Sequence, residues 1–342
     1  MAGNNAVLDV SICIPTYNGQ KYLGLAVESC LNQNFRGSWE ILIVDDQSRD
    51  DTLKIVKDYA EKNPSFIRIL RNRENKGLVE NWNTCIREAK GRWIKFLFQD
   101  DLLRSDCLQE MVSFGEKYQL KLVLCDRKYI CEKGTFLLQR IFPKRYWEKI
   151  FTIRIKKLSH YFNKQVIISA EELSGLCFSN FLKDNFLGEP IAGLFKKDLT
   201  KKLGFFNHDL KQISDFEYWL RIGLNEGLGY MPEKLVSFRM HREATSRKNA
   251  KIPIAFHDEI VLGWLLLESK YYEVFRKNMC RDKKLVQIRQ RYKTFLKKYI
   301  RLLGYFWLLE IMPGYGFSNY LEGFKPGFID HLRYRFRRPK NS

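Results

Sequence analysis

Two polar clusters in this chain each follow an apolar run and could recognise a nucleotide. One is Pro15-Thr16-Tyr17-Asn18 and the other is Asp45-Asp46. An acidic side chain at a strand end can accept a hydrogen bond from a base N–H or a ribose hydroxyl, and an aromatic ring can lie against a flat base. The alternatives are an ordinary strand-to-helix turn for the first cluster and helix capping through Ser48 and Asp50 for the second.

A second acidic pair, Asp100-Asp101, ends the apolar run of residues 93–98. Two adjacent carboxylates at a buried strand end repel each other unless a cation or a hydrogen-bond donor neutralises them. Hard divalent cations bind carboxylate and phosphate oxygens together, which suits a diphosphate leaving group. The pair therefore predicts a Mn²⁺ or Mg²⁺ site, and a solvated loop is the alternative.

Two further residues could take part in chemistry but are ambiguous by themselves. Asp215 and Glu217 flank Phe216 at the start of an aromatic helix, and a carboxylate within reach of a hydroxyl can act as a general base. The spacing alone favours a helix cap for Asp215. A single histidine such as His241 is more often structural than a ligand.

The elements that must position these residues alternate between strand and helix patterns, which predicts an α/β fold with a mostly parallel sheet and helices on both faces. The carboxyl ends of parallel strands meet at one edge, where open α/β sheets bind ligands. The first three polar clusters are therefore expected to lie side by side. Strands are predicted over residues 10–14, 40–44, 66–70, 93–98 and 120–125, and helices over 21–31, from 52 onward, 79–89 and 105–118.

The pattern is less regular after residue 126. A capping box, Ser169 to Glu172, predicts the start of a helix. A hairpin is expected over residues 129–138, strands over 191–195 and 232–240, and a helix over 215–224. We expect three parts: residues 8–125 and 126–246 as two parts of one domain, and residues 247–342 as a basic helical region.

Taken together and in order, these motifs resemble the family 2 inverting glycosyltransferases, which have the GT-A fold. The resemblance runs from about Val10 to Ser246, and it implies that residues 8–125 are the part that binds the nucleotide-sugar donor and residues 126–246 the part that binds the acceptor. It is carried by Ser-Ile-Cys-Ile-Pro-Thr-Tyr-Asn at residues 11–18, Val-Asp-Asp-Gln-Ser at 44–48, the stretch from Asn75 to Asn81, Gln99-Asp100-Asp101, Ser214-Asp215-Phe216-Glu217 and Phe238-Arg239-Met240-His241.

The resemblance implies transfer of a sugar from a nucleoside diphosphate donor, a UDP-sugar being favoured, to a hydroxyl of a glycan or lipid-linked acceptor. Asp215 would be the base, and Asp100, Asp101 and His241 would bind the metal. The donor would be held by Pro15, Thr16, Tyr17, Asn18, Asp46, Gly77, Asn81 and Gln99. Two departures, Phe98 in place of a first aspartate and Ser214 in place of an acid, keep open a binding module without catalysis.

The formal net charge of +20 favours an anionic partner. No zinc-finger or RNP-like motif supports nucleic acid. Residues 283–312 place Lys and Arg beside apolar residues at helical spacing, which is typical of a helix in a membrane interface, and packing on the catalytic domain is the alternative. With eight cysteines lacking Cys-x-x-Cys spacing and no signal-peptide pattern, a cytoplasmic protein at the inner face of the cell membrane is expected.

Overall fold

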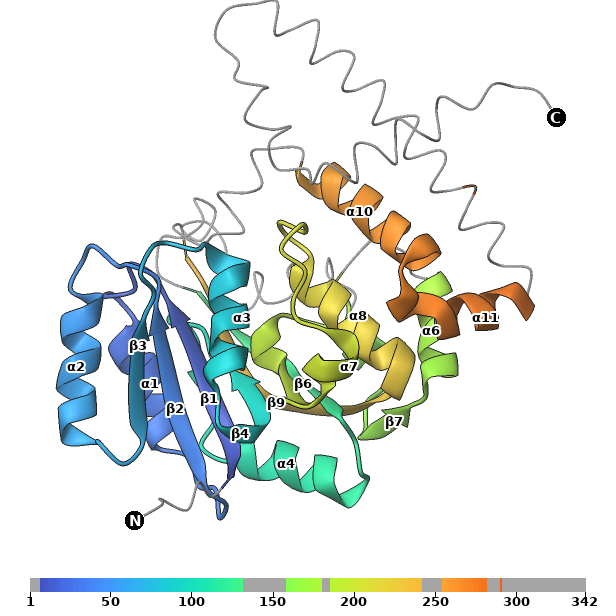
Figure 1. The fold of residues 1–342 in the computed structure, drawn as a ribbon. Helices are drawn as coiled ribbons and strands as arrows, with labels where there is room; N and C mark the ends of the chain where they lie inside the picture. The colour runs from blue at the N-terminus through green and yellow to red at the C-terminus, as the bar shows by residue number, and fades with distance from the viewer. Residues whose placement is uncertain (1–6, 132–157, 180–184, 242–253, 282–289, 291–342) are drawn as a thin grey trace, which may run out of the picture.

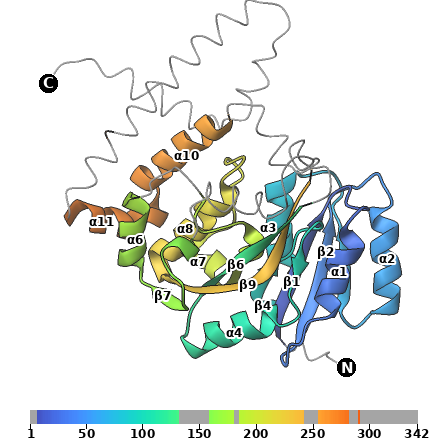
Figure 2. The same ribbon diagram turned by 180° about the vertical axis from the view of Figure 1, so that it is seen from behind.

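The computed structural model describes residues 7–131, 158–179, 185–241, 254–281 and 290. The nine strands in these ranges form one sheet, in the order β3-β2-β1-β4-β8-β6-β9-β5, with β7 paired to β9. Helices cover both faces (Figures 1 and 2). The expected α/β class with helices on both faces is confirmed.

The first half of the sheet is parallel, as expected. It comprises β1 (Leu8–Thr16), β2 (Trp39–Asp45), β3 (Ile67–Arg71) and β4 (Gly91–Phe96). Their register places Thr16 opposite Asp45. The connections are α1 (Leu23–Leu31), α2 (Thr52–Lys62) and α3 (Leu78–Glu88). The polar residues that follow β1, β2 and β4 therefore meet at one edge of the sheet.

The second half of the sheet is mixed. β8 (Gly193–Lys196) runs antiparallel to both β4 and β6 (Leu122–Cys131), and β9 (Leu228–Met240) runs parallel to β6. β5 (Leu102–Leu103) and β7 (Val166–Ile168) are short and pair antiparallel with β9. β6 crosses residues 125 and 126, so the two expected parts of the catalytic domain share one sheet.

One element prediction lies mostly outside the described ranges, and another was wrong. Residues 129–131, the start of the expected hairpin, form the end of β6, where each lies opposite a residue of β9; residues 132–138 lie outside the described ranges, so the hairpin stays a prediction. The last strand begins at Leu228 and not at 232, because Pro232 falls at the register shift between β6 and β9 and a proline is tolerated at such an irregularity.

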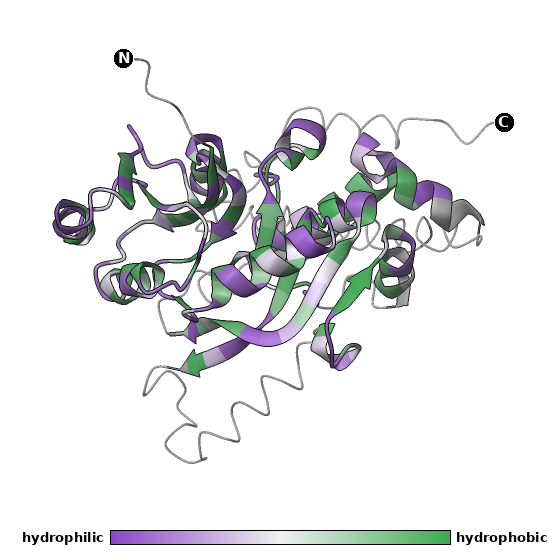
Figure 3. Ribbon diagram, turned by 90° about the horizontal axis from the view of Figure 1, so that it is seen from below, coloured by the Kyte–Doolittle hydropathy of each residue, from purple (hydrophilic) through white to green (hydrophobic). Residues whose placement is uncertain are grey.

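Alternate residues of the central strands enter two apolar layers, one on each face of the sheet. Cys13 and Phe96 pack with α3 and with α8 (Ser214–Glu226), whereas Ile12 and Trp93 pack with α1 and with α4 (Cys107–Lys117). The covering helices carry hydrophilic and hydrophobic sides (Figure 3). Apolar side chains thus fill both faces of the sheet. The place where a ligand can bind is therefore the edge at which the strands end.

The remaining helices lie on the α8 side. The capping box is confirmed: Ser169 N donates to Glu172 Oε2 at 2.8 Å, at the start of α6 (Ala170–Ser179). α7 (Leu199–Leu203) is a short helix. α10 (Ile254–Glu268) and α11 (Glu273–Arg281) come after the last strand, β9, in the chain. Among the described helices none is both long and apolar enough to span a bilayer, and the segment 283–312 lies outside the described residues apart from residue 290.

Candidate active site

A pocket of about 480 Å³ opens where β1, β2 and β4 end. Its walls bring together residues from three of the predicted clusters and from α8. Asn18, Asp101 and His241 are not part of its lining. The predicted residues that do line it are Pro15, Thr16, Tyr17, Asp46, Gly77, Asn81, Gln99, Asp100 and Asp215.

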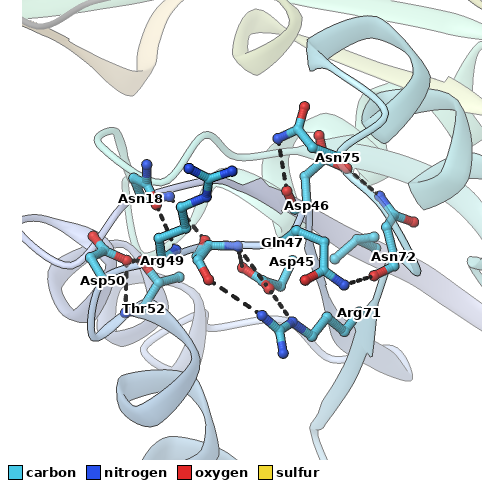
Figure 4. A network of polar contacts seen from close by, with 12 residues as sticks. Asn18, Asp45, Asp46, Gln47, Arg49, Asp50, Thr52, Arg71, Asn72 and Asn75 are labelled. Carbon is cyan, nitrogen blue, oxygen red and sulfur yellow. Dashed lines mark hydrogen bonds and ion pairs between the residues drawn. The ribbon is translucent and has the colours of Figure 1, made fainter.

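Asp46 organises the loop between β3 and α3. Its Oδ1 accepts hydrogen bonds from Asn72 Nδ2 at 2.7 Å and Lys76 N at 2.9 Å, and its Oδ2 accepts one from Gly77 N at 2.9 Å. The Asn75 side chain donates to the Asp46 backbone carbonyl (Figure 4). Gly77 has a φ of +81°, a conformation that favours glycine. Asp46 therefore builds the pocket wall as well as facing the pocket.

The acidic loop also contains a separate interaction at the start of α2. Asp50 Oδ1 accepts from Thr52 N at 3.1 Å (Figure 4), and Ser48 N donates to Asp45. Asp46 takes no part in these contacts. The cap position of α2 is Asp51, which makes no side-chain cap hydrogen bond, so neither Ser48 nor Asp50 is the N-cap residue. The contact of Asp50 with Thr52 N and pocket lining by Asp46 are compatible.

Hydrogen bonds hold the turn after β1 from two sides and leave the Tyr17 side chain exposed. Gln99 Oε1 accepts from Thr16 Oγ1 at 2.7 Å and from Tyr17 N at 2.9 Å. On the other side, Asn18 N donates to Ser48 Oγ at 2.9 Å. The Tyr17 residue remains 42% exposed at the pocket. Thr16, Asn18 and Gln99 hold the turn, and Tyr17 presents a surface to a ligand.

Asn81 has mainly a supporting position. It is buried, its Nδ2 donates to Val44 O at 3.1 Å, and its Oδ1 accepts from Asn72 Nδ2 at 3.0 Å. Sequence reasoning missed Asn72, which joins Asp46 to Asn81. Its position directly after strand β3 could have identified it, because the polar residues after β1, β2 and β4 were predicted as site residues from the same kind of position.

The second acidic pair separates into two environments. Asp100 lines the pocket, and its Oδ2 lies 2.8 Å from His241 Nε2. Asp101 is buried, and its Oδ1 accepts from Arg239 N at 2.7 Å. Burial, and then the neighbouring Asp100 charge, raise the pKa of Asp101 well above its ordinary value.

The fit to a divalent cation rests on the contact between Asp100 and His241. A carboxylate oxygen and an imidazole nitrogen are both ligands that Mn²⁺ accepts. No group of three possible protein ligands occurs among the described residues, so the other positions would fall to phosphate oxygens and water, as is usual for Mg²⁺ at nucleotides. The Asp100 and His241 side chains fit such an ion. Asp101 accepts a backbone hydrogen bond through Oδ1, and its buried Oδ2 has no hydrogen-bond partner among the described residues.

Asp215 also lines the pocket, from the first turn of α8. The helix begins at Ser214 with Ile213 at the cap position, so the expected helix-cap role of Asp215 was wrong. Its Oδ1 accepts from Phe216 N at 2.7 Å and its Oδ2 from Asn185 Nδ2 at 3.3 Å. Burial, and secondarily the Glu189 charge, raise the pKa of Asp215 to about 7. A carboxylate with such a pKa can take up a proton near neutrality.

Glu217 has a structural role instead. It is buried against Arg221 Nη2 at 2.9 Å and Tyr272 Oη at 2.7 Å. These contacts join α8 to the segment between α10 and α11. Glu217 does not line the pocket, which leaves Asp215 as the acid of this motif that faces a ligand.

A carboxylate from α10 holds the loop before α8. Asp258 is fully buried, and it accepts hydrogen bonds from three successive backbone N–H groups, Lys211, Gln212 and Ile213, at 3.0, 2.6 and 3.0 Å. Lys211 and Gln212 line the pocket. Successive backbone N–H groups of this kind form an anion-binding site, which the Asp258 carboxylate occupies here. The C-terminal helices therefore help to shape the wall next to Asp215.

Asp258→Ala is expected to lower the free energy of unfolding by about 1 to 3 kcal/mol, because the three N–H groups lose their acceptor. Urea denaturation measures the change. The matched control is Asp58→Ala on the exposed side of α2, for which we expect a change within about 0.5 kcal/mol. Equal effects of the two substitutions would contradict the role of Asp258.

Comparison with known proteins agrees with this geometry. Residues 11–171 match the model of glycosyl transferase family 2, and this region of the chain belongs to that family. The uncharacterized protein MT1568 of Mycobacterium tuberculosis (strain CDC 1551 / Oshkosh) is 28% identical over 264 residues, which are 76% of this chain and 76% of that protein.

Two solved structures share the fold. S. aureus TarS 1–349 in complex with UDP-GlcNAc has a TM-score of 0.55 at 18% identity, over 80% of this chain and 72% of that one. The mannosyltransferase PcManGT from Pyrobaculum calidifontis, in complex with GDP-Man and Mn²⁺, has a TM-score of 0.50 at 16% identity, over 86% and 83%. The fold of this chain is of the GT-A type.

Proposed function

We propose that this chain transfers a sugar from a nucleoside diphosphate sugar to an acceptor hydroxyl, with inversion at the anomeric carbon. The observation that carries this proposal is the placement of Asp215, with its pKa raised to about 7, on the wall of the pocket that Tyr17 and Asp46 also line. One pocket can thus hold a nucleotide at one end and a reacting hydroxyl at the other.

In this proposal each wall of the pocket has a separate task. The Tyr17 ring lies against the base, and the Asp46 loop contacts the nucleoside. Asp215 removes the proton of the acceptor hydroxyl, and that oxygen attacks the anomeric carbon from the face opposite the leaving diphosphate. Asp100 and His241 would hold a divalent cation, which when bound offsets negative charge on the leaving group.

The nucleotide is proposed to be uridine, with UDP-GlcNAc in the TarS complex as the support. A thermal-shift screen of UDP-, GDP- and dTDP-sugars with Mn²⁺ or Mg²⁺ tests the choice. A ligand at about 100 times its dissociation constant adds roughly 2.7 kcal/mol of stability, so the correct donor should raise the melting temperature measurably. A shift with GDP-sugars alone would contradict the choice of uridine.

A binding module without catalysis is the second candidate, motivated by Phe98 and Ser214. In the structure Phe98 stacks on Trp82 with ring centroids 5.3 Å apart, and Ser214 Oγ donates to Asn207 O at 3.0 Å. Both side chains therefore have packing roles that leave the Asp100 and Asp215 carboxylates in place. Turnover of a radiolabelled donor, by transfer or hydrolysis, separates an enzyme from a binding module.

We further propose a lipid-linked or growing surface glycan as the acceptor, and a position at the inner face of the cell membrane. The support is the basic and apolar pattern of residues 283–312. The protein is expected to sediment with vesicles that contain anionic lipid, and less so in high salt because exposed charges are screened. Removal of residues 283–342 should abolish sedimentation and spare donor binding. Unchanged sedimentation of the truncated protein would contradict this proposal.

A further inference from the structure

Glu189 is a further carboxylate that lines the pocket, and the sugar transfer proposed for Asp215 gives it no role. It lines the pocket together with Asp215, and its side chain is 21% exposed. Its ion-pair partner is Arg127 on β6, whose side chain is only 3% exposed and whose Nε contacts Glu189 Oε2. An unpaired buried guanidinium is costly, so pairing with Arg127 holds the Glu189 side chain in place at the pocket.

The backbone before Glu189 is built for this contact. Gly188 has a φ of +103°, and a Cβ atom at this position would lie 2.8 Å from Arg127 Nη1. Only glycine combines that conformation with the close approach of the guanidinium. Pro190 then begins the short helix η3 (Pro190–Ala192), which restricts the chain on the other side of Glu189.

The same turn is tied to the base. Asn185 Oδ1 accepts from Gly188 N at 2.9 Å, and Asn185 Nδ2 donates to Asp215 Oδ2 at 3.3 Å. One asparagine thus fixes both the turn that carries Glu189 and the orientation of the Asp215 carboxylate. The two acids are held relative to each other by the fold.

Charges on several elements act on Asp215. Glu189 at the start of η3 raises the pKa of Asp215 and Arg127 on β6 lowers it, both after the larger effect of burial. Lys211, from the loop before α8, also lines the pocket. Two carboxylates that line one pocket and are linked through Asn185 suit a ligand that offers two hydroxyl groups, because each acid can then accept its own hydrogen bond.

We infer that Glu189, held by Arg127, is an acceptor-binding residue: it accepts a hydrogen bond from the sugar hydroxyl next to the one that Asp215 deprotonates. This inference rests on the proposed function and deepens it. Glu189 is then a substrate-binding residue that distinguishes a sugar from a simple alcohol or water, and Arg127 is a positioning residue.

The test compares two reactions of the full-length chain with UDP-GlcNAc as donor. One is transfer to octyl β-glucoside or octyl β-galactoside, and the other is hydrolysis of the donor by water, which has no second hydroxyl. Glu189→Gln is expected to lower kcat/KM for the glycoside by about 10- to 100-fold, and to change the hydrolysis rate at alkaline pH by less than about threefold.

The pH profile supplies a readout that a purely structural role would not move. Wild-type kcat/KM should fall on the acid side with a midpoint near 7, because Asp215 must be ionised to act as a base. Glu189→Gln removes a negative charge and should move this midpoint to lower pH. Arg127→Gln removes a positive charge and should move it to higher pH. The control is Glu116→Gln, an exposed acid paired with Lys196 at 2.6 Å outside the pocket, which should leave the midpoint unchanged.

Several outcomes would overturn the inference. These are a glycoside rate within threefold of wild type, a midpoint that Glu189→Gln does not move, or a wild type that hydrolyses the donor and glycosylates neither glycoside. If Glu189→Gln fails to fold, Glu189→Asp takes its place: it keeps the charge, so the midpoint should stay while the glycoside rate drops, and an unchanged rate overturns the inference. A wild type that neither binds nor turns over any donor refutes the proposed function instead.

Discussion

Asp215→Asn is expected to reduce the rate of sugar transfer by about 10²- to 10⁴-fold, the usual contribution of a positioned general base. The amide oxygen of asparagine can still accept from Phe216 N, as Asp215 Oδ1 does, so the start of α8 should be unchanged. Donor binding should remain within about twofold, because the Tyr17 and Asp46 wall is untouched. Single-turnover kinetics and thermal shift with donor measure the two quantities.

The same variant should alter how stability depends on pH. The pKa of Asp215 rises from 3.8 to about 7 on folding, so between these values the native state binds more protons than the unfolded state. Stability of the wild type therefore falls as pH rises through this window, and Asp215→Asn should lack that part of the fall. Asp58→Asn, an exposed position on α2, is the control. Near-normal turnover of Asp215→Asn would refute its assignment as the base.

Asp100→Ala is expected to remove the dependence of transfer on divalent cations and to lower the rate by at least about 10²-fold, because a bound metal supplies several kcal/mol of charge stabilisation. Asp100 lines the pocket and contacts His241, so His241→Ala should weaken metal binding as well. Mn²⁺ binding in the presence of UDP, followed by electron paramagnetic resonance, provides a measurement that does not depend on turnover.

The matched control for this experiment is Asp106→Ala. Asp106 is an exposed aspartate that pairs with Arg104 at 2.8 Å and does not line the pocket. The Asp106→Ala substitution should leave both Mn²⁺ binding and sugar transfer unchanged. Full activity of the wild type in excess EDTA would show instead that the contact between Asp100 and His241 is structural.

The alternation of apolar runs and polar turns was enough to predict which strand ends meet at the pocket. Residues at the ends of β1, β2 and β4 were expected at one sheet edge, and the pocket is lined there by Tyr17, Asp46 and Asp100. This worked because parallel strands buried on both faces are nearly continuous apolar runs, and their ends are marked by the first polar residues. The motif order likewise identified the family of residues 11–171.

Other features were decided only by contacts between distant segments. Nothing in the pair Asp100-Asp101 distinguishes the two acids, yet one faces the pocket and the other accepts from Arg239 N, because β9 runs past them. The extent of β6 was decided in the same way: its residues 129–131 pair with β9, more than 100 residues later in the chain.

By itself, the sequence determined the α/β class, the parallel half of the sheet and which strand ends carry the polar residues of the pocket, because these depend on local periodicity and on the types of residues in each turn. Only the tertiary structure decided that burial raises the pKa of Asp215 to about 7, that Arg127 pairs with Glu189 while Asn185 links Gly188 to Asp215, and that Asp258 of α10 holds the adjoining loop. Burial and electrostatic coupling depend on which segments meet in space, and spacing along the chain does not contain that information.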